Sequence, residues 1–251
     1  MMQKTSFRFE VVIGDDCSTD NTCGIIREFA ERYPDVIRPV YQPVNVGGAR
    51  NAYEFCYPIL TGKYIAVCEG DDYWTDSFKL QRQVGFLEQN PDYAFCFHRV
   101  KGIDEENSVI SEQATLEHPV LYSWKDIFHI SIPTLSVVFK KCFDAIPPEM
   151  FKVKSGDVFL FGLLSKYGDA ADLGFIGGVY RKHKGGVFSP KTQFEQFRQS
   201  LETRRLMGKS SAFPNKQKVE IAREIAKRKL LYFKYFFKKT ELVHCLKIVL
   251  V

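Results

Sequence analysis

Pairs of adjacent carboxylates follow two short apolar runs of this 251-residue chain. Asp15 and Asp16 come after FEVVIG, and Asp71 and Asp72 come after KYIAVC. Because neighbouring anions repel each other, such pairs tend to persist where a cation lies between or beside them. Carboxylate oxygens suit Mg²⁺ or Mn²⁺, which proteins bind jointly with a substrate phosphate. The pattern therefore indicates a metal site that neutralises a departing diphosphate.

Helix capping is the alternative explanation for the same acidic stretches. Ser18, Thr19 and Asp20 are able to cap the helix that follows the first pair, and Asp76 is able to cap the next one. Capping explains two adjacent carboxylates at a strand end less easily than single ones. The first pair is also able to accept a hydrogen bond from a nucleobase N–H, so a nucleotide site competes with capping there. Glu69, which precedes the second pair, has no assigned role.

Two other stretches carry groups with possible chemistry. Asp157 stands at the head of an apolar stretch, where it either stabilises a helix N-terminus or acts as a general base for an acceptor hydroxyl. Spacing alone favours the first role. Arg181, His183 and Lys184 lie beside two glycines, which indicates either an exposed basic turn or an anion-binding loop. In the second case His183 is a metal ligand or a diphosphate donor.

Strands and helices alternate along the part of the chain that must position these residues. β-Branched and apolar runs predict strands over 9–14, 36–42, 63–68, 93–98, 134–141 and 172–183. Apolar residues at helical spacing predict helices over 23–34, 47–60, 77–90 and 156–168. The alternation predicts an α/β fold with an open, mostly parallel sheet flanked by helices. Ligands bind beyond the carboxyl ends of strands in such sheets, which is where both acidic pairs fall.

The last sixty or so residues are helical in pattern and basic. We therefore divide the chain into a domain over 1–190 and a helical C-terminal extension over 191–251. The extension mixes Lys and Arg with Leu, Tyr and Phe, which predicts either packing on the domain or peripheral contact with an anionic membrane surface. The net charge of +5 is explained by a solvated helix face, so no nucleic-acid partner is expected.

Cysteine usage and the first residues bear on the compartment. The seven cysteines are scattered and show no CxxC pattern, which predicts free thiols in a reducing environment. The start MMQKTSFRFE lacks the apolar core of a signal peptide. No run reaches roughly 18 apolar residues, so no spanning helix is expected. The expected location is cytoplasmic, at the inner face of the plasma membrane if the extension binds lipid.

Five motifs in order resemble the family-two inverting glycosyltransferases, which have the glycosyltransferase A-type fold. They are EVVIGDDCSTDNT, NVGGARNA, GKYIAVCEGDDYWTDSFKLQRQVGFLE, the pair IPTLSVVFKK and SGDVFLFGLLSKYG, and GGVYRKHKGGVFS. The resemblance covers residues 7–190, and its third motif is the most specific. It implies transfer of a sugar from a nucleotide-linked donor, most commonly UDP-linked, to a hydroxyl of a glycan or lipid-linked acceptor. It further implies inversion at the anomeric carbon and a role in surface polysaccharide or lipopolysaccharide synthesis.

The resemblance also implies roles for the donor-side residues. Asp16 is expected to contact the nucleobase, with Asp15 supporting it. Arg50 is expected near the nucleotide, and Asp71 beside the ribose.

On the catalytic side, the resemblance implies that Asp72 binds Mg²⁺ or Mn²⁺. His183 is expected to touch the metal or the diphosphate. Asp157 matches the base that takes the proton from the acceptor hydroxyl.

One departure from the family pattern concerns the N-terminal side. The family has a strand and a helix ahead of the position of Phe9, and the strand supplies part of the nucleobase pocket. Their absence predicts unpaired ladder groups and a less stable domain. An alternative function is therefore a catalytically impaired module that binds a nucleotide sugar or a partner. A nucleotide-sugar pyrophosphorylase is disfavoured, because the chain lacks a Gly-rich phosphate loop near its start.

Overall fold

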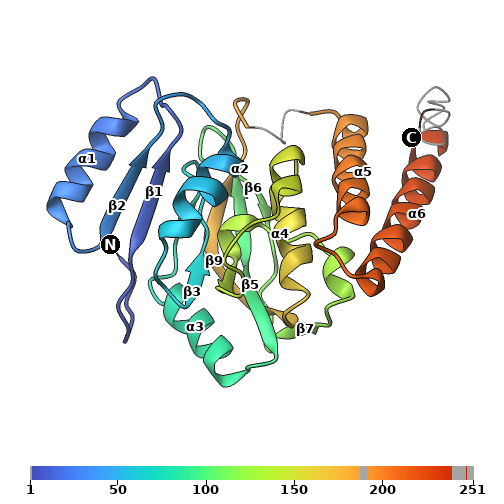
Figure 1. The fold of residues 1–251 in the computed structure, drawn as a ribbon, viewed down its shortest axis with the longest axis horizontal. Helices are drawn as coiled ribbons and strands as arrows, with labels where there is room; N and C mark the ends of the chain where they lie inside the picture. The colour runs from blue at the N-terminus through green and yellow to red at the C-terminus, as the bar shows by residue number, and fades with distance from the viewer. Residues whose placement is uncertain (1, 187–190, 239–246, 248–251) are drawn as a thin grey trace.

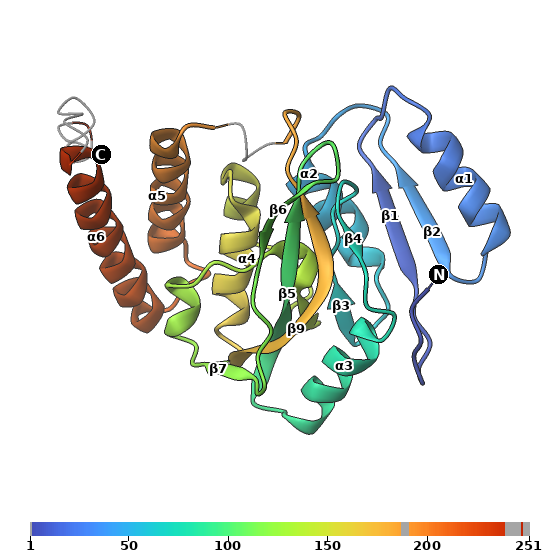
Figure 2. The same cartoon turned by 180° about the vertical axis from the view of Figure 1, so that it is seen from behind.

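The structure, a computed structural model, describes residues 2–186, 191–238 and 247. Figures 1 and 2 show the main sheet with helices on both of its faces. The strands in chain order are β1 (Val11–Asp15), β2 (Ile37–Tyr41), β3 (Tyr64–Ala66), β4 (Tyr73–Trp74), β5 (Tyr93–Ile103), β6 (Val109–Glu112), β7 (Val120–Tyr122), β8 (Val138–Lys140) and β9 (Asp169–Arg181).

The helices correspond to the predicted ones, with one irregular segment. They are α1 (Thr22–Arg32), α2 (Gly48–Arg50), α3 (Lys79–Gln89), α4 (Gly156–Leu164), α5 (Gln193–Lys209) and α6 (Asn215–Lys238). The helix expected over 47–60 begins as α2, continues as wide π-type turns over Asn51–Cys56 and ends in a tight turn over Tyr57–Ile59. A single short helical turn, Asp126–Phe128, follows β7.

The predicted α/β architecture, an open sheet flanked by helices, is confirmed, and the sheet is mixed. A seven-stranded sheet has the order β3-β8-β5-β9-β4, with β6 added to β5 and β7 added to β9. Within it β5 and β9 are parallel, and the other pairs are antiparallel. The expectation of a mostly parallel sheet does not hold, because the predicted strand β8 is antiparallel to both β3 and β5. The strands β4, β6 and β7, which were not predicted, also enter antiparallel.

β5 is the central strand and is buried on both faces. Its successive side chains point to opposite faces, as in any strand. Phe95 points toward α4 and stacks on Phe161 with ring centroids 5.7 Å apart. Cys96 points toward α3, where its carbonyl accepts a 3.2 Å hydrogen bond from Gln83 Nε2. This two-sided burial fixes α3 and α4 on opposite faces of the sheet.

The strands β1 and β2 form a second, parallel sheet, seen with α1 at one end of the molecule in Figure 1. β1 pairs with β2, β3 pairs with β8, and no strand pair joins the two sheets among the described residues. Side chains near the facing edges, including Val12, Ala66 and Val84, line a cavity of about 1960 Å³. A strand paired on one edge directs alternate backbone groups toward its other edge, so β1 and β3 both direct such groups toward this cavity. One of them, the Gly14 carbonyl of β1, accepts a hydrogen bond from Asn51 Nδ2 at 2.9 Å.

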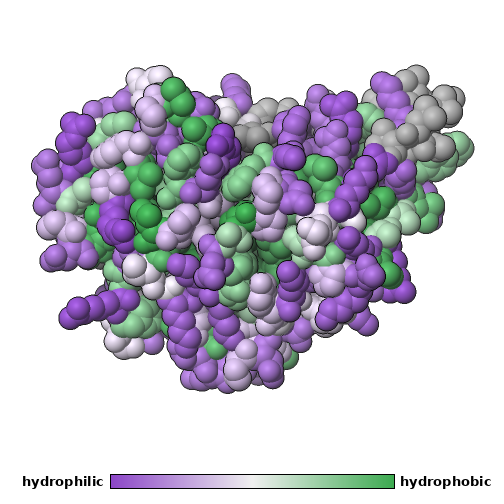
Figure 3. Space-filling model, in the orientation of Figure 1, coloured by the Kyte–Doolittle hydropathy of each residue, from purple (hydrophilic) through white to green (hydrophobic). Residues whose placement is uncertain are grey.

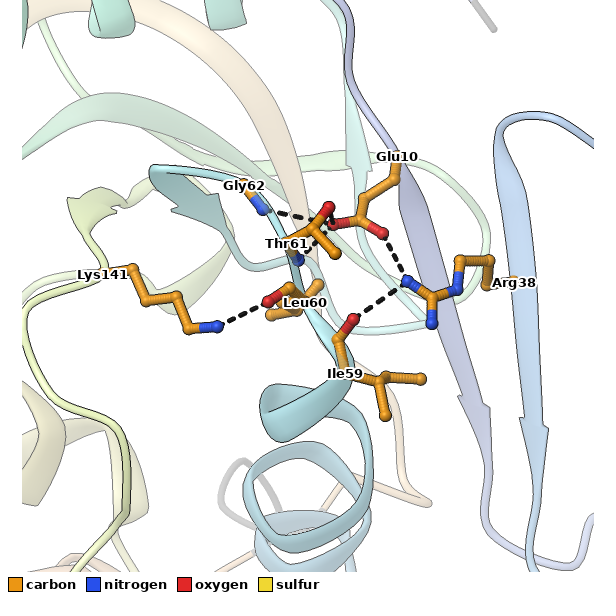
Figure 4. A network of polar contacts seen from close by, with 7 residues as sticks. All are labelled: Glu10, Arg38, Ile59, Leu60, Thr61, Gly62 and Lys141. Carbon is orange, nitrogen blue, oxygen red and sulfur yellow. Dashed lines mark hydrogen bonds and ion pairs between the residues drawn. The ribbon is translucent and has the colours of Figure 1, made fainter.

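Glu10 links the two sheets across this cavity (Figure 4). Its Oε1 accepts hydrogen bonds from Thr61 N and Thr61 Oγ1, at 2.6 and 2.7 Å, and from Gly62 N at 3.3 Å. Arg38 of β2 donates from Nη1 to Glu10 Oε2 and to the Ile59 carbonyl, both at 2.9 Å. This polar network therefore connects the two sheets, as backbone hydrogen bonds connect neighbouring strands within each sheet.

The basic C-terminal extension is helical as far as the structure describes it. α5 begins with a capping box formed by Thr192 and Glu195. It packs beside α6 at the opposite end of the molecule from β1 (Figure 1). The expected helical stretches over 239–246 and 248–251, and the part of the closing loop over 187–190, lie outside the described residues. The division at residue 190 stays a prediction.

The state of the cysteines and the length of the helices follow from the described ranges. The six cysteines within them are all free, as predicted. Across the same ranges, every helix is too short or too polar to cross a membrane.

We predict that Glu10→Ala lowers the free energy of unfolding by about 1–3 kcal/mol, because Thr61, Gly62 and Arg38 lose a charged acceptor. Partial burial alone would raise the pKa of Glu10, but the hydrogen bonds from Thr61 and Arg38 outweigh it and lower the pKa. A lowered folded-state pKa gives stability above the unfolded value that disappears as the pH falls. Urea denaturation at neutral pH and at about pH 3 measures the difference.

Glu28→Ala is the matched control, since Glu28 forms an exposed pair with Arg32 on α1 that contributes little. An equal loss for Glu10→Ala at both pH values would contradict the prediction.

Candidate active site

The loop that carries Asp71 and Asp72 is anchored by the two residues of β4. Tyr73 and Trp74 pair with Val179 and Gly178 of β9. A Cβ atom on Gly178 would lie 2.9 Å from a Leu135 methyl carbon and 3.0 Å from the Tyr73 carbonyl oxygen, so only glycine lets β4 approach this closely. The acidic loop is therefore held against the end of β9.

Trp74 is itself fixed by two contacts. Its indole Nε1 donates to the Leu135 carbonyl at 2.8 Å. The Lys79 ammonium lies 3.8 Å from the centroid of the Trp74 ring, and Lys79 is fully buried. Burial lowers the pKa of Lys79 to about 7. These contacts orient the indole, so the acidic loop cannot move without disrupting the packing of α3.

Asp71 and Asp72 face the carboxyl end of β9. The Arg181 N–H donates to Asp72 Oδ1 at 2.8 Å, and His183 Nε2 lies 2.9 Å from Asp71 Oδ2. The structure thus brings His183 to Asp71 more directly than to the predicted metal ligand Asp72. Burial and the neighbouring charge of Asp71 raise the pKa of Asp72 to about 6, despite the hydrogen bond from Arg181. This carboxylate lacks a full counter-charge.

Glu69 lies beside the same pair and lines the cavity. Burial raises the pKa of Glu69 to about 7, and the charges of Asp72 and Asp71 add to the shift, against a hydrogen bond from Thr134. Burial raises the pKa of Tyr53, and the negative charges of Glu69 and Asp157 raise it further. Glu69 and Tyr53 therefore belong to the same acidic pocket, although neither was assigned a role from the sequence.

Asp157 lies in the first turn of α4, after the N-cap residue Ser155. Burial raises the pKa of Asp157, while the Val158 N–H and the charge of Arg204 act in the opposite direction. A carboxylate with a raised pKa that faces a cavity is suited to take a proton. The structure therefore supports both readings of this residue, since it stands at a helix N-terminus and also lines the cavity.

Near the end of β1, the carboxylates of Asp15 and Asp16 accept hydrogen bonds from groups of the protein itself. Asp15 is buried, and its Oδ2 accepts from the Ser18 N–H and the Cys23 thiol, both at 3.1 Å. The hydrogen bond from Ser18, reinforced by Cys23, lowers the pKa of Asp15 against its burial. Asp16 accepts from the Val46 and Gly47 N–H groups at 2.7 and 2.9 Å. Both side chains thus tie the acidic turn together and to the loop before α2.

Arg50 lines the cavity but is paired within its own helix. Its Nε and Nη2 donate to the two oxygens of Glu54 at 2.6 and 2.9 Å. A ligand phosphate near Arg50 would have to compete with this exposed pair, which is a weak competitor.

One cavity connects most of the predicted residues. Its lining includes Arg50, Asp71, Asp72, Asp157 and His183, whereas Asp15 and Asp16 are not among the lining residues. The structure therefore brings together segments that are more than 80 residues apart in the sequence and leaves the first acidic pair outside.

The residues present fit a divalent cation that is shared with a ligand. Within the described part of the chain, no three His, Cys, Asp or Glu side chains are grouped so that they could hold a metal by themselves. Mg²⁺ and similar ions often take only one or two carboxylates and complete their shell with phosphate and water. Asp72 uses Oδ1 for Arg181, and its raised pKa shows that a further positive charge would be favourable there.

Sequence reasoning missed Arg204 and Gln199 of α5. Both are buried and line the cavity on the side of Asp157. The basic run around Arg204 reads as a solvated helix face, and only the fold shows that this arginine points inward.

We predict that Glu69→Gln raises the free energy of unfolding at pH 8 by about 1–2 kcal/mol, a value reduced for solvent screening in the cavity. The folded-state pKa of Glu69 is raised to about 7, so its ionised form costs stability above that pH. Near pH 4 the carboxyl is largely protonated in both states, and the substitution should have little effect. Chemical denaturation at the two pH values measures this.

Glu106→Gln, in an exposed loop, is the control and should change stability little at either pH. A Glu69→Gln variant that is less stable at pH 8 than the parent chain would refute the electrostatic explanation.

The sequence relatives cover different shares of the chain. Rv1520 of Mycobacterium tuberculosis, an uncharacterized protein, is 36% identical over 195 residues, which are 74% of this chain and 54% of that protein. The UDP-Glc:alpha-D-GlcNAc-diphosphoundecaprenol beta-1,3-glucosyltransferase WfaP of Escherichia coli is 34% identical over 87 residues, 35% of this chain and 33% of that protein. The chain thus spans about half the length of the mycobacterial relative and about a third of the length of WfaP.

Solved structures share the fold. Residues 1–349 of TarS from S. aureus, in complex with UDP, match 92% of this chain and 64% of that chain with a TM-score of 0.58 and 19% identity. The mannosyltransferase PcManGT of Pyrobaculum calidifontis, with GDP-Man and Mn²⁺, matches 87% of this chain and 65% of that chain with a TM-score of 0.55 and 15% identity. At these identities the likeness concerns the fold alone.

A family profile gives the assignment. Residues 2–146, more than half of the chain, match the family described as Glycosyl transferase family 2. This stretch contains the two acidic turns and the strands that carry them. The chain belongs to glycosyltransferase family 2.

Proposed function

We propose that this chain transfers a sugar from a UDP-linked donor to a hydroxyl of a glycan or lipid-linked acceptor, with inversion. The observation that carries the proposal is the convergence of Asp71, Asp72, Asp157 and His183 on one cavity from three distant segments. Inverting transfer needs these components: a cation site for the leaving diphosphate and, on another side, a base for the acceptor.

The chemistry is a single displacement. The acceptor oxygen forms a bond to the anomeric carbon of the donor while the bond to the nucleoside diphosphate breaks, and Asp157 takes the acceptor proton. Asp72 would hold Mg²⁺ or Mn²⁺, and His183 would contact the metal or the diphosphate. The cation, when bound, neutralises the charge that develops on the diphosphate. The Arg181 N–H orients Asp72 for this task.

The donor side is assigned to residues near β1 and in the acidic loop. Asp71 lies beside the ribose, and Asp16 contacts the nucleobase through oxygen lone pairs that its bonds to Val46 and Gly47 leave available. Asp15 keeps this turn in place, and Arg50 turns from Glu54 toward the nucleotide. UDP is proposed because TarS binds UDP and WfaP is named for UDP-Glc.

Synthesis of surface polysaccharide or lipopolysaccharide is the proposed context, since WfaP is named for a sugar acceptor on a diphosphate lipid. The proposed location is cytoplasmic, at the inner face of the plasma membrane.

A second candidate is a binding module without turnover. It is favoured by the engagement of Asp16 with backbone N–H groups and of Arg50 with Glu54.

The outward face of α6 is the proposed membrane contact. Val219, Leu230 and Phe237 are 50%, 56% and 59% exposed and follow one stripe of the helix. Lys227 and Lys234 lie beside this stripe, and both acidic residues of α6, Glu220 and Glu224, are buried. Figure 3 shows apolar and hydrophilic side chains interspersed along the right-hand edge, which α6 forms. Such a surface complements anionic lipid.

We predict that Asp157→Asn loses sugar transfer by a factor of about 10²–10⁴, the usual contribution of a general base. It should retain Mn²⁺-dependent protection against thermal unfolding by the same donor, because Asp157 acts on the acceptor. The measurement is a screen of UDP- and GDP-sugars for thermal protection with and without Mn²⁺. Turnover is then followed with the best donor as release of the nucleoside diphosphate.

Asp35→Asn, on the exposed turn after α1, is the control and should behave as the parent chain. Donor binding without any turnover in the parent chain would favour the binding module. An absence of metal-dependent protection by every donor would reject sugar transfer and favour a module that binds a partner.

We predict that the chain floats with vesicles that contain anionic phospholipid and does not float with neutral vesicles. Leu230→Glu combined with Phe237→Glu should abolish flotation, because it places charge in the apolar stripe. Ile110→Glu, at an exposed position on β6, is the control and should have no effect. Equal flotation of the double variant and the parent chain would reject α6 as the contact.

A further inference from the structure

Helix α5 presents a row of polar side chains to the cavity beside Asp157. The row consists of Gln196, Gln199, Ser200 and Arg204, all of which line the cavity. Gln196, Ser200 and Arg204 recur at every fourth position, and Gln199 is three residues after Gln196, so all four lie on one side of the helix. Gln199 and Arg204 are only 5% and 4% exposed. A buried amide and a buried guanidinium need specific partners, so this face is built for a particular contact.

Gln199 holds the turn that leads into α4. Its Nε2 donates to the Lys154 carbonyl at 3.1 Å and to Ser155 Oγ at 3.3 Å. Its Oε1 accepts from Lys191 Nζ at 2.6 Å. Ser155 is the N-cap residue of α4, two positions before Asp157. The α5 amide therefore fixes the backbone from which the Asp157 side chain projects.

Arg204 supplies positive charge on the same side of Asp157. Its Nη1 donates to Ser200 Oγ at 2.7 Å, which holds the guanidinium against its own helix. The attraction between Arg204 and Asp157 lowers the pKa of Asp157, in opposition to the burial that raises it. The same attraction acts on Arg204, whose pKa burial and Arg228 lower to about 10, so Arg204 remains charged at neutral pH.

The other charged groups around this pair also come from packed elements. On the side of α6, Arg228 and Glu224 face Arg204 and form an ion pair with each other. Tyr53, in the segment after α2, interacts electrostatically with both Glu69 and Asp157. Glu69 adds negative charge to the pocket when it is ionised. Arg204 is therefore the positive group that acts on Asp157 most directly among the described residues.

We infer that α5 is part of the active centre, with Arg204 as the buried positive charge on the Asp157 side of the cavity and Gln199 as the residue that holds the turn before Asp157. Both are positioning residues, because they act through Asp157. The inference rests on the proposed function in that Asp157 is the base. It means that the C-terminal extension completes the catalytic site, beyond any role in membrane contact.

The test is the pH dependence of kcat and the ionisation of the Asp157 carboxyl. Removal of the counter-charge in Arg204→Gln should move the acidic limb of the kcat profile to higher pH by about one unit. Arg204→Lys should restore most of the shift, and KM for the donor should change little in both. Arg205→Gln, the neighbouring arginine outside the cavity lining, is the matched control and should leave the limb in place.

A second readout is independent of turnover. The Asp157 carboxyl is titrated by ¹³C NMR and identified by its absence in Asp157→Asn. Its apparent pKa should rise by about one unit in Arg204→Gln, and by less in Ser200→Ala, which only loosens Arg204. Ser200→Ala also gives a result if Arg204→Gln does not fold.

The outcomes separate the two proposals. A carboxyl titration that is unchanged in Arg204→Gln, or in Ser200→Ala where Arg204→Gln fails to fold, overturns the inference. A chain that shows the expected shift but transfers no sugar refutes the proposed function and leaves the Arg204–Asp157 pair intact. For Gln199→Met we expect a lower kcat with an unmoved acidic limb, and an unchanged kcat would overturn the role of Gln199.

Discussion

The parallel pairing of β5 with β9 is the constraint on which the rest of the molecule depends. The two strands are the longest in the sheet, and their register runs from Tyr93 beside Asp169 to Ile103 beside Arg181. β9 carries β4 on its other edge and so fixes the acidic loop. Because β5 is buried on both faces, it also fixes α3 and α4. The β5–β9 ladder thus positions the acidic loop, the basic end of β9 and the helix that bears Asp157.

The site concentrates negative charge at a cost to stability. Glu69 and Asp72 both have raised pKa values because burial and mutual repulsion penalise their ionised forms. A fold selected for stability alone would not place these groups together. Their arrangement is favourable only when a cation or a proton is present. The acidic pocket is therefore better explained by what it binds than by the packing around it.

Regular elements could be predicted from the sequence, and irregular contacts could not. The apolar runs gave β1, β2, β3, β5, β8 and β9, since a periodic pattern of five or more residues carries a signal. The two residues of β4 are too few to show a period, and the pairing direction of β6 and β7 depends on where the chain turns back. The division into two sheets also depends on partners that are distant in the sequence.

The same distinction applies to the site. Asp71, Asp72 and His183 could be singled out as candidates from residue type and from their position at the ends of predicted strands. For Asp157, spacing alone favours a helix N-terminus, and only the family resemblance indicates a base. The engagement of Asp16 by Val46 and Gly47 could not, since it depends on how the NVGG loop folds back. Arg204 also gave no signal, because its sequence neighbours are basic and its inward direction is set by the packing of α5.

The division of the sheet has a consequence for how the molecule opens. β1, β2 and α1 are joined to the remainder by polar links such as the Glu10 network rather than by a shared ladder. Segments with few buried contacts across their boundary open at a lower free energy than the global transition. Partial unfolding is thus expected to release β1, β2 and α1, with the proposed nucleobase contact, first and to leave β5, β9 and α4 folded around Asp157. Recognition of the donor base and the chemistry of transfer would then reside in cooperative units of unequal stability.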